Sequence, residues 1–380
     1  MSGPSFIFAG GGTGGHIFPA LAIAGALRAS ADVRTHVVCS DRPLDAQMLE
    51  ASVARGEVDR FTSIPARPFG LRPRALGRLV ASWGVCVRAV RAIIQSEKAE
   101  AESVTLVAMG GFVSAPAVQA ARAERCRVVL VNLDAAAGLA NRWIARRVDE
   151  RFAVVAAPDK PAGLDWTVVH PIVRAGVLVP RSPADARRAF GLDPERPTLL
   201  VTGGSQGARS INNFIAAFVA RHRASLRNWQ VIHQCGSEDP GALEMLYEAA
   251  GVRALVVPFI DSMADAWAAA DAALARAGAG TVAEAWATAT PTLFLPYPYH
   301  ADLHQRRNAE PLVAAGGSLL AADLIDPGSN LEAHGGALLG LIEGNPERER
   351  MRAALRGLGP ADGASSISAT LLGGFRRDPL

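Results

Sequence analysis

A glycine-rich segment follows the first apolar run of the chain and limits what this region can fold into. Residues 6–9 are apolar and predict a short buried strand, and residues 10–16 contain five glycines and end in His16. The next apolar stretch, residues 17–27, predicts a helix with Pro19 early in it, where a missing N–H costs little. Glycine permits positive φ and a close approach to the bare backbone, while a helix N-terminus favours an anion. The pattern predicts either a phosphate-binding turn or a plain turn between a strand and a helix.

His16 favours the ligand-binding interpretation of this turn. A histidine at the mouth of such a turn faces the ligand crevice, where a near-neutral pKa suits proton transfer. A lone histidine is more often structural, so this alternative stays open. No Lys-Ser or Lys-Thr pair follows the glycines, which excludes a P-loop.

The strand, glycine turn and helix pattern recurs and divides the chain into two halves. Residues 104–109 and 198–202 are further apolar runs, each followed by a Gly-Gly pair and a helical pattern. Strands that alternate with helices indicate a parallel α/β sheet, and 380 residues are enough for two domains. We expect an N-terminal Rossmann-like domain over 1–170, a linker over 171–197, a second Rossmann-like domain over 198–344, and C-terminal helices over 345–380 that return to the first domain.

Composition argues against a nucleic-acid-binding, zinc-stabilised, secreted or membrane-spanning protein. The net charge of +3 is too small to indicate nucleic-acid binding, and the four cysteines are scattered, which fits a reducing cytoplasm without a structural zinc site. Residues 1–27 lack the basic n-region of a signal peptide. Residues 103–121 are uncharged and long enough to span a bilayer, but their internal Gly-Gly pair and Pro116 favour a strand, loop and helix. We therefore expect no transmembrane helix.

Arginines alternate with apolar residues over 67–94, around Trp83. An ordinary helix with a buried face and a solvated arginine face gives this pattern. A surface that binds anionic lipid gives it as well.

A further glycine-containing stretch, residues 276–284, ends in Glu284 at the start of a predicted helix. A carboxylate there can accept both hydroxyls of a ribose, or it can simply complement the helix dipole. His300 and His304 lie four residues apart, but no carboxylate follows at ligand spacing and the chain has no Asp-x-Asp pair at this site. We expect no metal and no cofactor.

The order and spacing of these segments resemble the MurG family, glycosyltransferases that transfer N-acetylglucosamine to lipid I and make lipid II for peptidoglycan. The segments that carry the resemblance are residues 11–16, 109–116, 138–143, 203–208, 276–284 and 305–309. It implies a GT-B fold, with two Rossmann-like parallel-sheet domains facing a cleft. It also implies a metal-independent, inverting hexosyltransferase that uses UDP-N-acetylglucosamine as donor.

The resemblance assigns roles to individual residues. Glu284 would bind the ribose and Ile260 the uracil. Ser205 and the loop 279–281 would meet the diphosphate, and Gln305 the sugar. The full set of implied substrate-binding residues is Thr13, Gly14, Gly15, Asp134, Arg174, Ser205, Ile260, Ala279, Gly280, Thr281, Val282, Ala283, Glu284 and Gln305.

The resemblance also implies that the first domain takes the lipid acceptor, with the turn at residues 13–15 near the reacting centre. Arg174 would correspond to a nucleotide-contacting arginine. A single displacement needs a base for the acceptor hydroxyl and positive groups for the leaving diphosphate. Our hypothesis is that His16 assists the proton transfer, while backbone N–H groups stabilise the phosphates.

The acceptor would be undecaprenyl-pyrophosphoryl-MurNAc-pentapeptide. This predicts a peripheral protein at the cytoplasmic face of the cell membrane, in contact with an anionic surface and with cell-wall synthesis proteins. Residues 67–94 would then be the lipid-binding surface.

One run departs from the family pattern. Residues 131–134 read Val-Asn-Leu-Asp where the family has His-Glu-Gln-Asn, so Asp134 replaces a sugar-contacting asparagine and cannot donate an amide N–H. The family's Gly-Asn-Pro-Val-Arg run is also altered, at residues 169–174. Two alternatives therefore remain: a related UDP-sugar enzyme, either a 2-epimerase or a transferase with another acceptor, and a catalytically weakened UDP-sugar-binding partner in cell-wall assembly. A nicotinamide dehydrogenase is more distant, because the first half lacks a ribose-binding acid after its second strand.

Overall fold

The computed structural model describes residues 3–12, 14–68, 73–154, 163–204, 207–299 and 303–373, without the side chains of 73–76 and 78. The chain forms two compact units: unit 1 is Met1–Arg174 with Asp362–Leu380, and unit 2 is Ala175–Ala361. The boundaries differ from the expected ones. Most of the expected linker belongs to unit 2, and the chain returns to unit 1 at Asp362 rather than at residue 345. The reason is packing, because Met351 and Leu355 are buried in the hydrophobic core of unit 2.

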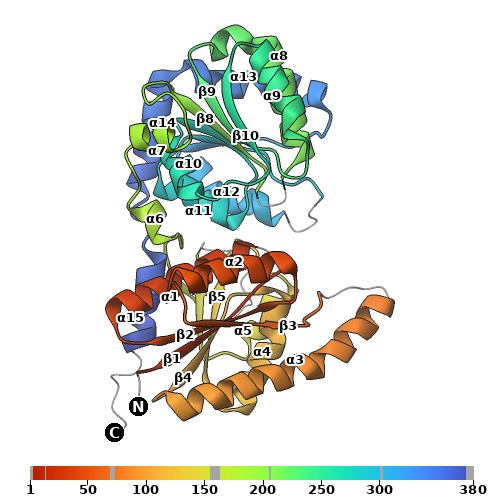
Figure 1. Cartoon of the computed structure of the whole chain (residues 1–380), viewed down its shortest axis with the longest axis vertical. Coiled ribbons are helices and arrows are strands. Elements are labelled where there is room, and N and C mark those ends of the chain that lie inside the picture. The colour runs from red at the N-terminus through yellow and green to blue at the C-terminus, as the bar shows by residue number, and fades with distance from the viewer. Residues whose placement is uncertain are drawn as a thin grey trace. The chain divides into compact units, whose positions relative to one another are not determined.

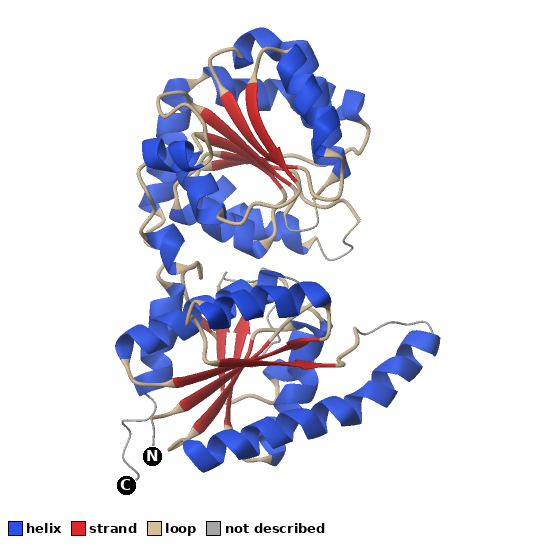
Figure 2. Ribbon diagram, viewed as in Figure 1, coloured by secondary structure: helices blue, strands red, loops and turns tan. Residues whose placement is uncertain are grey.

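Unit 1 is built on a seven-stranded parallel sheet with the order β3-β2-β1-β4-β5-β6-β7 (Figure 1). Helices α1, α2 and α15 cover one face of this sheet, and α3 and α4 cover the other (Figure 2). The strands are β1 Ser5–Ala9, β2 Arg34–Ser40, β3 Arg60–Ile64, β4 Val104–Ala108, β5 Arg127–Asn132, β6 Glu150–Ala153 and β7 Thr167–Val168. The helices are α1 Gly14–Ser30, α2 Pro43–Ala54, α3 Pro73–Glu100, α4 Gly111–Ala123, α5 Leu139–Ala145 and α15 Gly363–Gly373.

Unit 2 repeats this architecture with a six-stranded parallel sheet of order β10-β9-β8-β11-β12-β13. Its strands are β8 Thr198–Thr202, β9 Gln230–Gln234, β10 Arg253–Val257, β11 Ala272–Ala275, β12 Thr292–Phe294 and β13 Ser318–Leu320. Its helices are α6 Ala175–Leu178, α7 Pro183–Ala189, α8 Arg209–Leu226, α9 Pro240–Ala249, α10 Met263–Ala269, α11 Ala279–Ala287, α12 His304–Ala314, α13 Pro327–Glu343 and α14 Asn345–Gly357. The prediction of two Rossmann-like parallel-sheet domains is confirmed.

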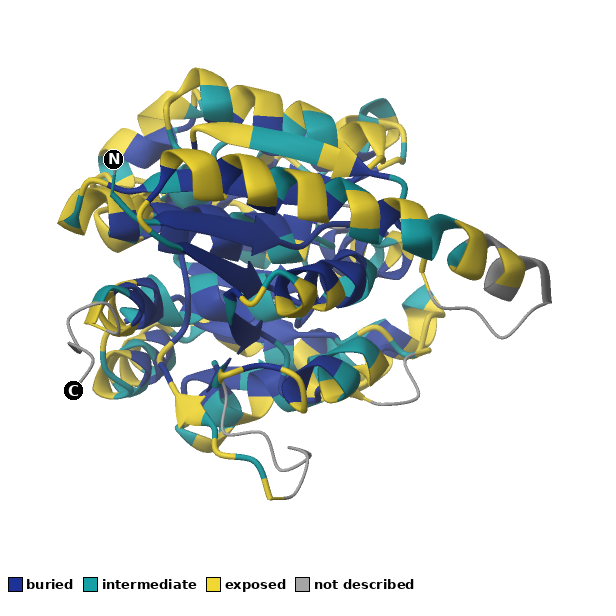
Figure 3. Ribbon diagram, turned by 90° about the horizontal axis from the view of Figure 1, so that it is seen from below, coloured by how far each residue is buried: buried dark blue, intermediate teal, exposed yellow. Residues whose placement is uncertain are grey.

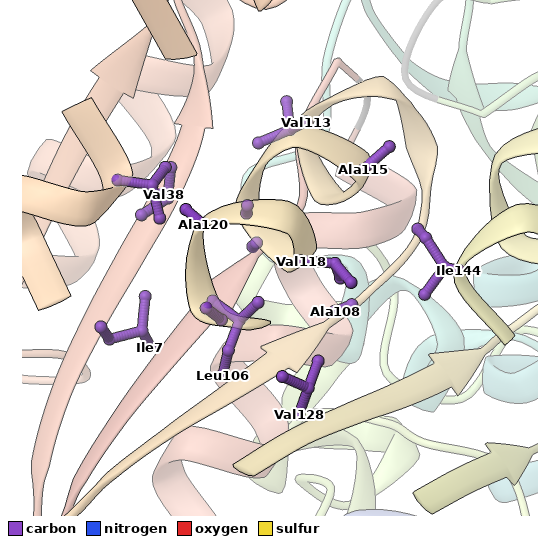
Figure 4. Packing of buried hydrophobic residues seen from close by; sticks show 14 of the residues in the cluster. Ile7, Val38, Leu106, Ala108, Val113, Ala115, Val118, Ala120, Val128 and Ile144 are labelled. Atoms are coloured by element: carbon purple, nitrogen blue, oxygen red, sulfur yellow. The ribbon is translucent and has the colours of Figure 1, made fainter. Parts of the chain in front are cut away.

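The core of unit 1 explains why its strands read as continuous apolar runs. In a parallel sheet covered on both faces, consecutive residues of a central strand are all buried. Ile7, Leu106 and Val128 come from three neighbouring strands and are fully buried, together with Val113 and Val118 of α4 (Figure 4). Burying such side chains contributes roughly 1.5–3 kcal/mol each. This packing fixes the carboxyl ends of the strands, where the glycine turns begin.

The predicted start of helix α1 was wrong, and helix α2 was not predicted. Helix α1 begins at Gly14, so Pro19 lies inside its second turn rather than early in it. A proline there removes one helical hydrogen bond, which the packing of a mostly buried helix offsets. Helix α2 was not expected from the sequence, because only Asp45, Leu49 and Ser52 are buried on it and they form no apolar stripe.

The uncharged stretch 103–121 forms β4 and α4 of the core, as predicted. Helix α3 is a different case. By length and composition its segment Leu79–Glu100 could cross a membrane, although such a test is also met by core helices of soluble proteins. Cys86, Val90 and Ile94 on this helix are buried against the sheet, whereas its outer side is exposed (Figure 3).

Candidate active site

The strand order of unit 1 reverses between β1 and β4, and the two glycine turns of this unit follow these strands. In open α/β sheets, ligands bind at the carboxyl ends of the strands beside such a reversal. Gly12, Gly110 and Gly111 have φ of 88°, 97° and 75°, values that favour glycine. A Cβ on Gly12 would lie 2.5 Å from Cε1 of Phe112. The glycines thus serve the packing of the two turns as well as any ligand.

His16 lies in the first turn of α1, beside the second glycine turn. A Cβ on Gly111 would lie 3.2 Å from Cε1 of His16, and the His16 Nδ1 atom is buried without a hydrogen-bond partner among the described residues. Burial lowers the pKa of His16, and the carboxylates of Asp134 and Asp45 and the Gly11 carbonyl counteract this only in part. A lowered pKa keeps the imidazole neutral at pH 7, the form that accepts a proton.

Asp45 and Arg42 hold the β1–α1 turn, and the sequence analysis missed both. The backbone N–H of Gly12 donates to Oδ2 of Asp45 over 2.6 Å, and the hydroxyl of Ser40 donates to the same oxygen over 2.6 Å. The Arg42 guanidinium donates to the Gly12 carbonyl. An acidic residue just after a strand and Pro43 was the available signal.

Asp134 belongs to the loop after β5, on the other side of β4. The amide of Asn141 donates to Oδ1 of Asn132 over 2.8 Å, and the Asn132 amide donates to the Asp134 carbonyl over 2.7 Å. This chain fixes the loop backbone, and the Asp134 carboxylate is close enough to raise the pKa of His16. The altered run 131–134 therefore places a negative charge beside His16.

The remaining sites predicted in unit 1 lie at the start of α1. Gly14 and Gly15 are helical, and a Cβ on Gly14 would lie 3.0 Å from Cε2 of Phe18. The Arg174 guanidinium stacks on Phe18, with 4.4 Å between Cζ and the ring centroid. Gly14, Gly15, His16 and Arg174 thus occupy one region. Thr13 lies outside the described residues.

In unit 2 the strand order reverses between β8 and β11, and a glycine turn again follows β8. A Cβ on Gly203 would lie 2.3 Å from the Ala208 nitrogen, and Gly207, with φ of 71°, packs against Gly236. These close approaches require glycine. Ser205 lies outside the described residues.

Helix α11 follows β11 and presents an open N-terminus. Gly278 precedes it without a side-chain cap, and a Cβ on Gly278 or Gly280 would meet nothing within 4 Å. The first-turn N–H groups, at Ala279, Gly280 and Thr281, have no intrahelical acceptor. Such a terminus binds anions such as phosphates. Val282 and Ala283 are buried, so any ligand contact of theirs would come from the backbone.

Three other predicted donor residues have defined surroundings in unit 2. Glu284 accepts a hydrogen bond at Oε2 from the Trp267 indole over 2.8 Å, which orients its carboxylate. Gln305, on α12, accepts at Oε1 from the Tyr297 backbone N–H over 2.8 Å. The Ile260 side chain is buried in the core, which leaves its main chain for a nucleobase.

Arg276, directly after β11, has a role that the sequence did not reveal. Its guanidinium donates to the carboxylate of Asp323 over 2.7 Å, to the Ser210 hydroxyl over 2.8 Å and to the Leu295 carbonyl over 2.8 Å. Arg276 is 7% exposed and the Asp323 side chain is fully buried. This network connects the segments that follow strands β8, β11, β12 and β13.

A metal site and a surface hollow were also considered as functional sites. The described residues contain no group of three or more His, Cys, Asp or Glu side chains arranged to hold a metal ion, and His300 lies outside them. A hollow of about 440 Å³, lined by Lys98, Arg125 and Arg127 among others, opens at the amino ends of β4 and β5, away from the turns.

Two parallel-sheet units, each with a glycine turn where its strand order reverses, place the chain in the GT-B class of folds. Comparison with known families agrees: residues 6–153 match the glycosyltransferase family 28 N-terminal domain, and residues 198–353 match its C-terminal domain. Solved structures with the same fold include Acinetobacter baumannii MurG, with a TM-score of 0.69, 22% identity and coverage of 98% of this chain and 100% of that one. A UDP-N-acetylglucosamine 2-epimerase shares the fold at 15% identity and a TM-score of 0.64, covering 100% and 99%.

Curated relatives give the family. UDP-N-acetylglucosamine–N-acetylmuramyl-(pentapeptide) pyrophosphoryl-undecaprenol N-acetylglucosamine transferase from Sorangium cellulosum is 33% identical, covering 96% of this chain and 87% of the relative. The protein of the same name from Frankia casuarinae is 37% identical, and the match covers 97% of this chain and 95% of the relative. The chain therefore belongs to the MurG family of glycosyltransferases.

Proposed function

We propose that this protein transfers N-acetylglucosamine from UDP-N-acetylglucosamine to the MurNAc 4-hydroxyl of lipid I, which yields lipid II for peptidoglycan synthesis. The observation that carries the proposal is the identity of 33–37% to transferases of this name over nearly the whole chain. The 2-epimerases share only the fold, at 15% identity.

Unit 2 would bind the donor. The open N-terminus of α11, at Ala279, Gly280 and Thr281, offers backbone N–H groups to the diphosphate, as Ser205 would from the β8 turn. The Glu284 carboxylate, oriented by Trp267, would accept the ribose hydroxyls. Gln305 would contact the sugar and the Ile260 main chain the uracil.

Unit 1 would bind the acceptor and activate it. In one displacement the acceptor hydroxyl forms a bond to the anomeric carbon, the bond from that carbon to the UDP oxygen breaks, and UDP leaves with the electron pair. The neutral imidazole of His16 would take the hydroxyl proton, and helix N-termini would stabilise the charge on the leaving diphosphate. The turn at Thr13, Gly14 and Gly15, with Asp134, would line the acceptor region, and Arg174 would contact the nucleotide.

The outer side of α3 would hold the protein on the cytoplasmic face of the membrane. Val80 is 68% exposed and Val85 is 43% exposed, and Arg88 lies exposed on the same helix. Apolar side chains beside arginines suit an interface with anionic lipid. Val80→Ser with Val85→Ser should reduce sedimentation with phosphatidylglycerol vesicles, whereas Val168→Ser, at a valine of β7 that is 51% exposed, should not. Equal loss in both proteins would contradict this surface.

A transfer assay with lipid I and radiolabelled UDP-N-acetylglucosamine tests the activity. We expect labelled lipid II and release of UDP, and a kcat about 10²–10⁴-fold lower in His16→Ala. Conversion of the donor without acceptor would indicate an epimerase, and binding without turnover would indicate a sugar-nucleotide-binding partner.

The donor site has its own test. Glu284→Gln should weaken UDP-N-acetylglucosamine binding about tenfold or more, because a charged hydrogen bond to the ribose is lost. Glu248→Gln, an exposed residue of α9, is the matched control. Unchanged affinity in Glu284→Gln would remove Glu284 from the donor site.

A further inference from the structure

The backbone of Gly12 is held at both of its polar groups by one short segment, the start of α2. Its N–H donates to Asp45 Oδ2 over 2.6 Å and its carbonyl accepts from the Arg42 guanidinium. Four residues later comes His16, already inside α1. A glycine with φ of 88° in a turn is otherwise free to adopt several conformations. The contacts to Arg42 and Asp45 therefore select one of them.

The Asp45 carboxylate is buried and held by hydrogen bonds. It is 1% exposed, and its Oδ2 also accepts from the Ser40 hydroxyl over 2.6 Å. A Cβ on Gly11 would lie 2.8 Å from this same oxygen, so Gly11 leaves room for the carboxylate. A buried carboxylate without a lysine or arginine pair is costly, and such groups are kept where hydrogen bonds hold them.

The other side of the turn is also fixed. The ring of Phe112 lies against Gly12 and beneath the Arg42 guanidinium, with 5.4 Å between Cζ and the ring centroid. Arg42 therefore contacts both the first and the second glycine turn. The segment Arg42–Asp45 joins the ends of β1, β2 and β4 at the point where the reaction would take place.

We propose that Asp45, assisted by Arg42, is a positioning residue for glycosyl transfer, because it fixes the Gly12 peptide and so sets the place of His16 at the start of α1. The proposal rests on the proposed function of the site. Asp45 is buried and bonded to the Gly12 N–H, so it would act through the turn. Among the described residues, the carboxylates of Asp134 and Asp45 are the charged groups that shift the pKa of His16, and both raise it against the effect of burial.

The variants separate geometry from charge. Asp45→Ala removes the acceptor of the Gly12 N–H, whereas Asp45→Asn keeps an acceptor oxygen and loses the charge. Asp59→Ala is the matched control, because Asp59 Oδ2 also accepts from a backbone N–H and a hydroxyl, both of Thr35, at 2.7 and 2.9 Å. Asp59 lies at the amino end of β3, away from the turn.

We expect kcat for lipid II formation to fall about a hundredfold in Asp45→Ala, the effect of a small misplacement of a catalytic group, with donor affinity unchanged. Asp45→Asn should restore kcat to within a few-fold. In Asp45→Asn, the acidic limb of the pH–kcat profile should move to lower pH, because one charge that raises the pKa of His16 is gone. Asp59→Ala should keep both kcat and the profile.

Hydrogen exchange of the peptide that covers residues 10–18 gives a readout independent of the reaction. It should become faster in Asp45→Ala and stay unchanged in Asp59→Ala, whether or not lipid I is the acceptor. Wild-type kcat or exchange in Asp45→Ala, or a pH profile of Asp45→Asn that coincides with wild type, would overturn the proposal. If Asp45→Ala does not fold, the pH profile of Asp45→Asn still decides. Absence of lipid II formation by the wild type would instead refute the proposed function.

Discussion

Replacing Arg276 with methionine would leave the carboxylate of Asp323 buried without its counter-charge. The two side chains are 8% and 0% exposed and lie 2.7 Å apart, so water cannot take over the role of the guanidinium. Removing one partner of a buried ion pair costs about 3–5 kcal/mol. The Leu295 and Pro296 carbonyls would lose a donor as well.

This loss of stability should appear as a lower Tm of unit 2. For a unit the length of Ala175–Ala361, one kcal/mol lowers Tm by roughly 2–4 °C, so Arg276→Met should lower the Tm of unit 2 by about 6–20 °C. Calorimetry of the full chain gives the transition. Hydrogen exchange of β8 and β11 assigns it to unit 2. Because Arg276 also holds Ser210 at the start of α8, UDP-N-acetylglucosamine affinity should fall about tenfold at a temperature where the protein is folded.

A second buried arginine of unit 2 provides the control. Arg187 pairs with Asp271 over 2.8 Å at the amino ends of β8 and β11, away from the glycine turn. Arg187→Met should also lower Tm, by less because the Asp271 side chain is 25% exposed, and should leave donor affinity intact. Equal donor affinity in the two variants, or a wild-type Tm in Arg276→Met, would refute the reasoning about the network.

Three further predictions concern buried groups and one glycine. Burial lowers the pKa of His233 to about 4 from 6.5, so unit 2 should gain stability as pH rises between these values, and His233→Gln should flatten that part of a urea-unfolding series. Hydrogen bonds from His36 and Arg34 lower the pKa of Glu97 to about 2, so the stability lost in Glu97→Gln at pH 7 should shrink as pH falls from about 4.5 toward 2 in the same assay. Gly363→Ala would place a Cβ 2.0 Å from the His170 carbonyl oxygen and should cost about 3 kcal/mol by thermal unfolding, whereas Gly373→Ala, in open space, should be nearly neutral; a neutral Gly363→Ala would contradict the packing of α15.

Much of the fold was predictable, because strands of a parallel sheet buried on both faces read as apolar runs. Residues 104–109 and 198–202 gave β4 and β8 nearly to their ends. Helix α2 has no such signal, since it buries few apolar side chains. The start of α1 was misplaced, because glycines at residues 14 and 15 weigh against a helix locally and the packing of the helix outweighs them.

The candidate site was predictable only in part. Glycine turns are local, so spacing along the chain indicated them. The partners that hold the turns are not local: Asp45 is 33 residues from Gly12, and Asp323 is 47 residues from Arg276. No periodicity links such pairs, and the position of Asp45 just after a strand and Pro43 indicates neither its burial nor its partner. The roles of His16, Glu284 and Gln305 remain predictions for the assays above.

The chain enters and leaves unit 2 at neighbouring points of unit 1, since Ile172 and Asp362 form an antiparallel bridge. Unit 2 is thus one continuous stretch inserted into unit 1, whose own chain is interrupted. A gene fragment for residues 175–361 would encode a whole folding body, whereas truncation after residue 174 would deprive unit 1 of α15. Joining residue 174 to residue 362 by a short linker would instead give unit 1 a continuous chain of its own.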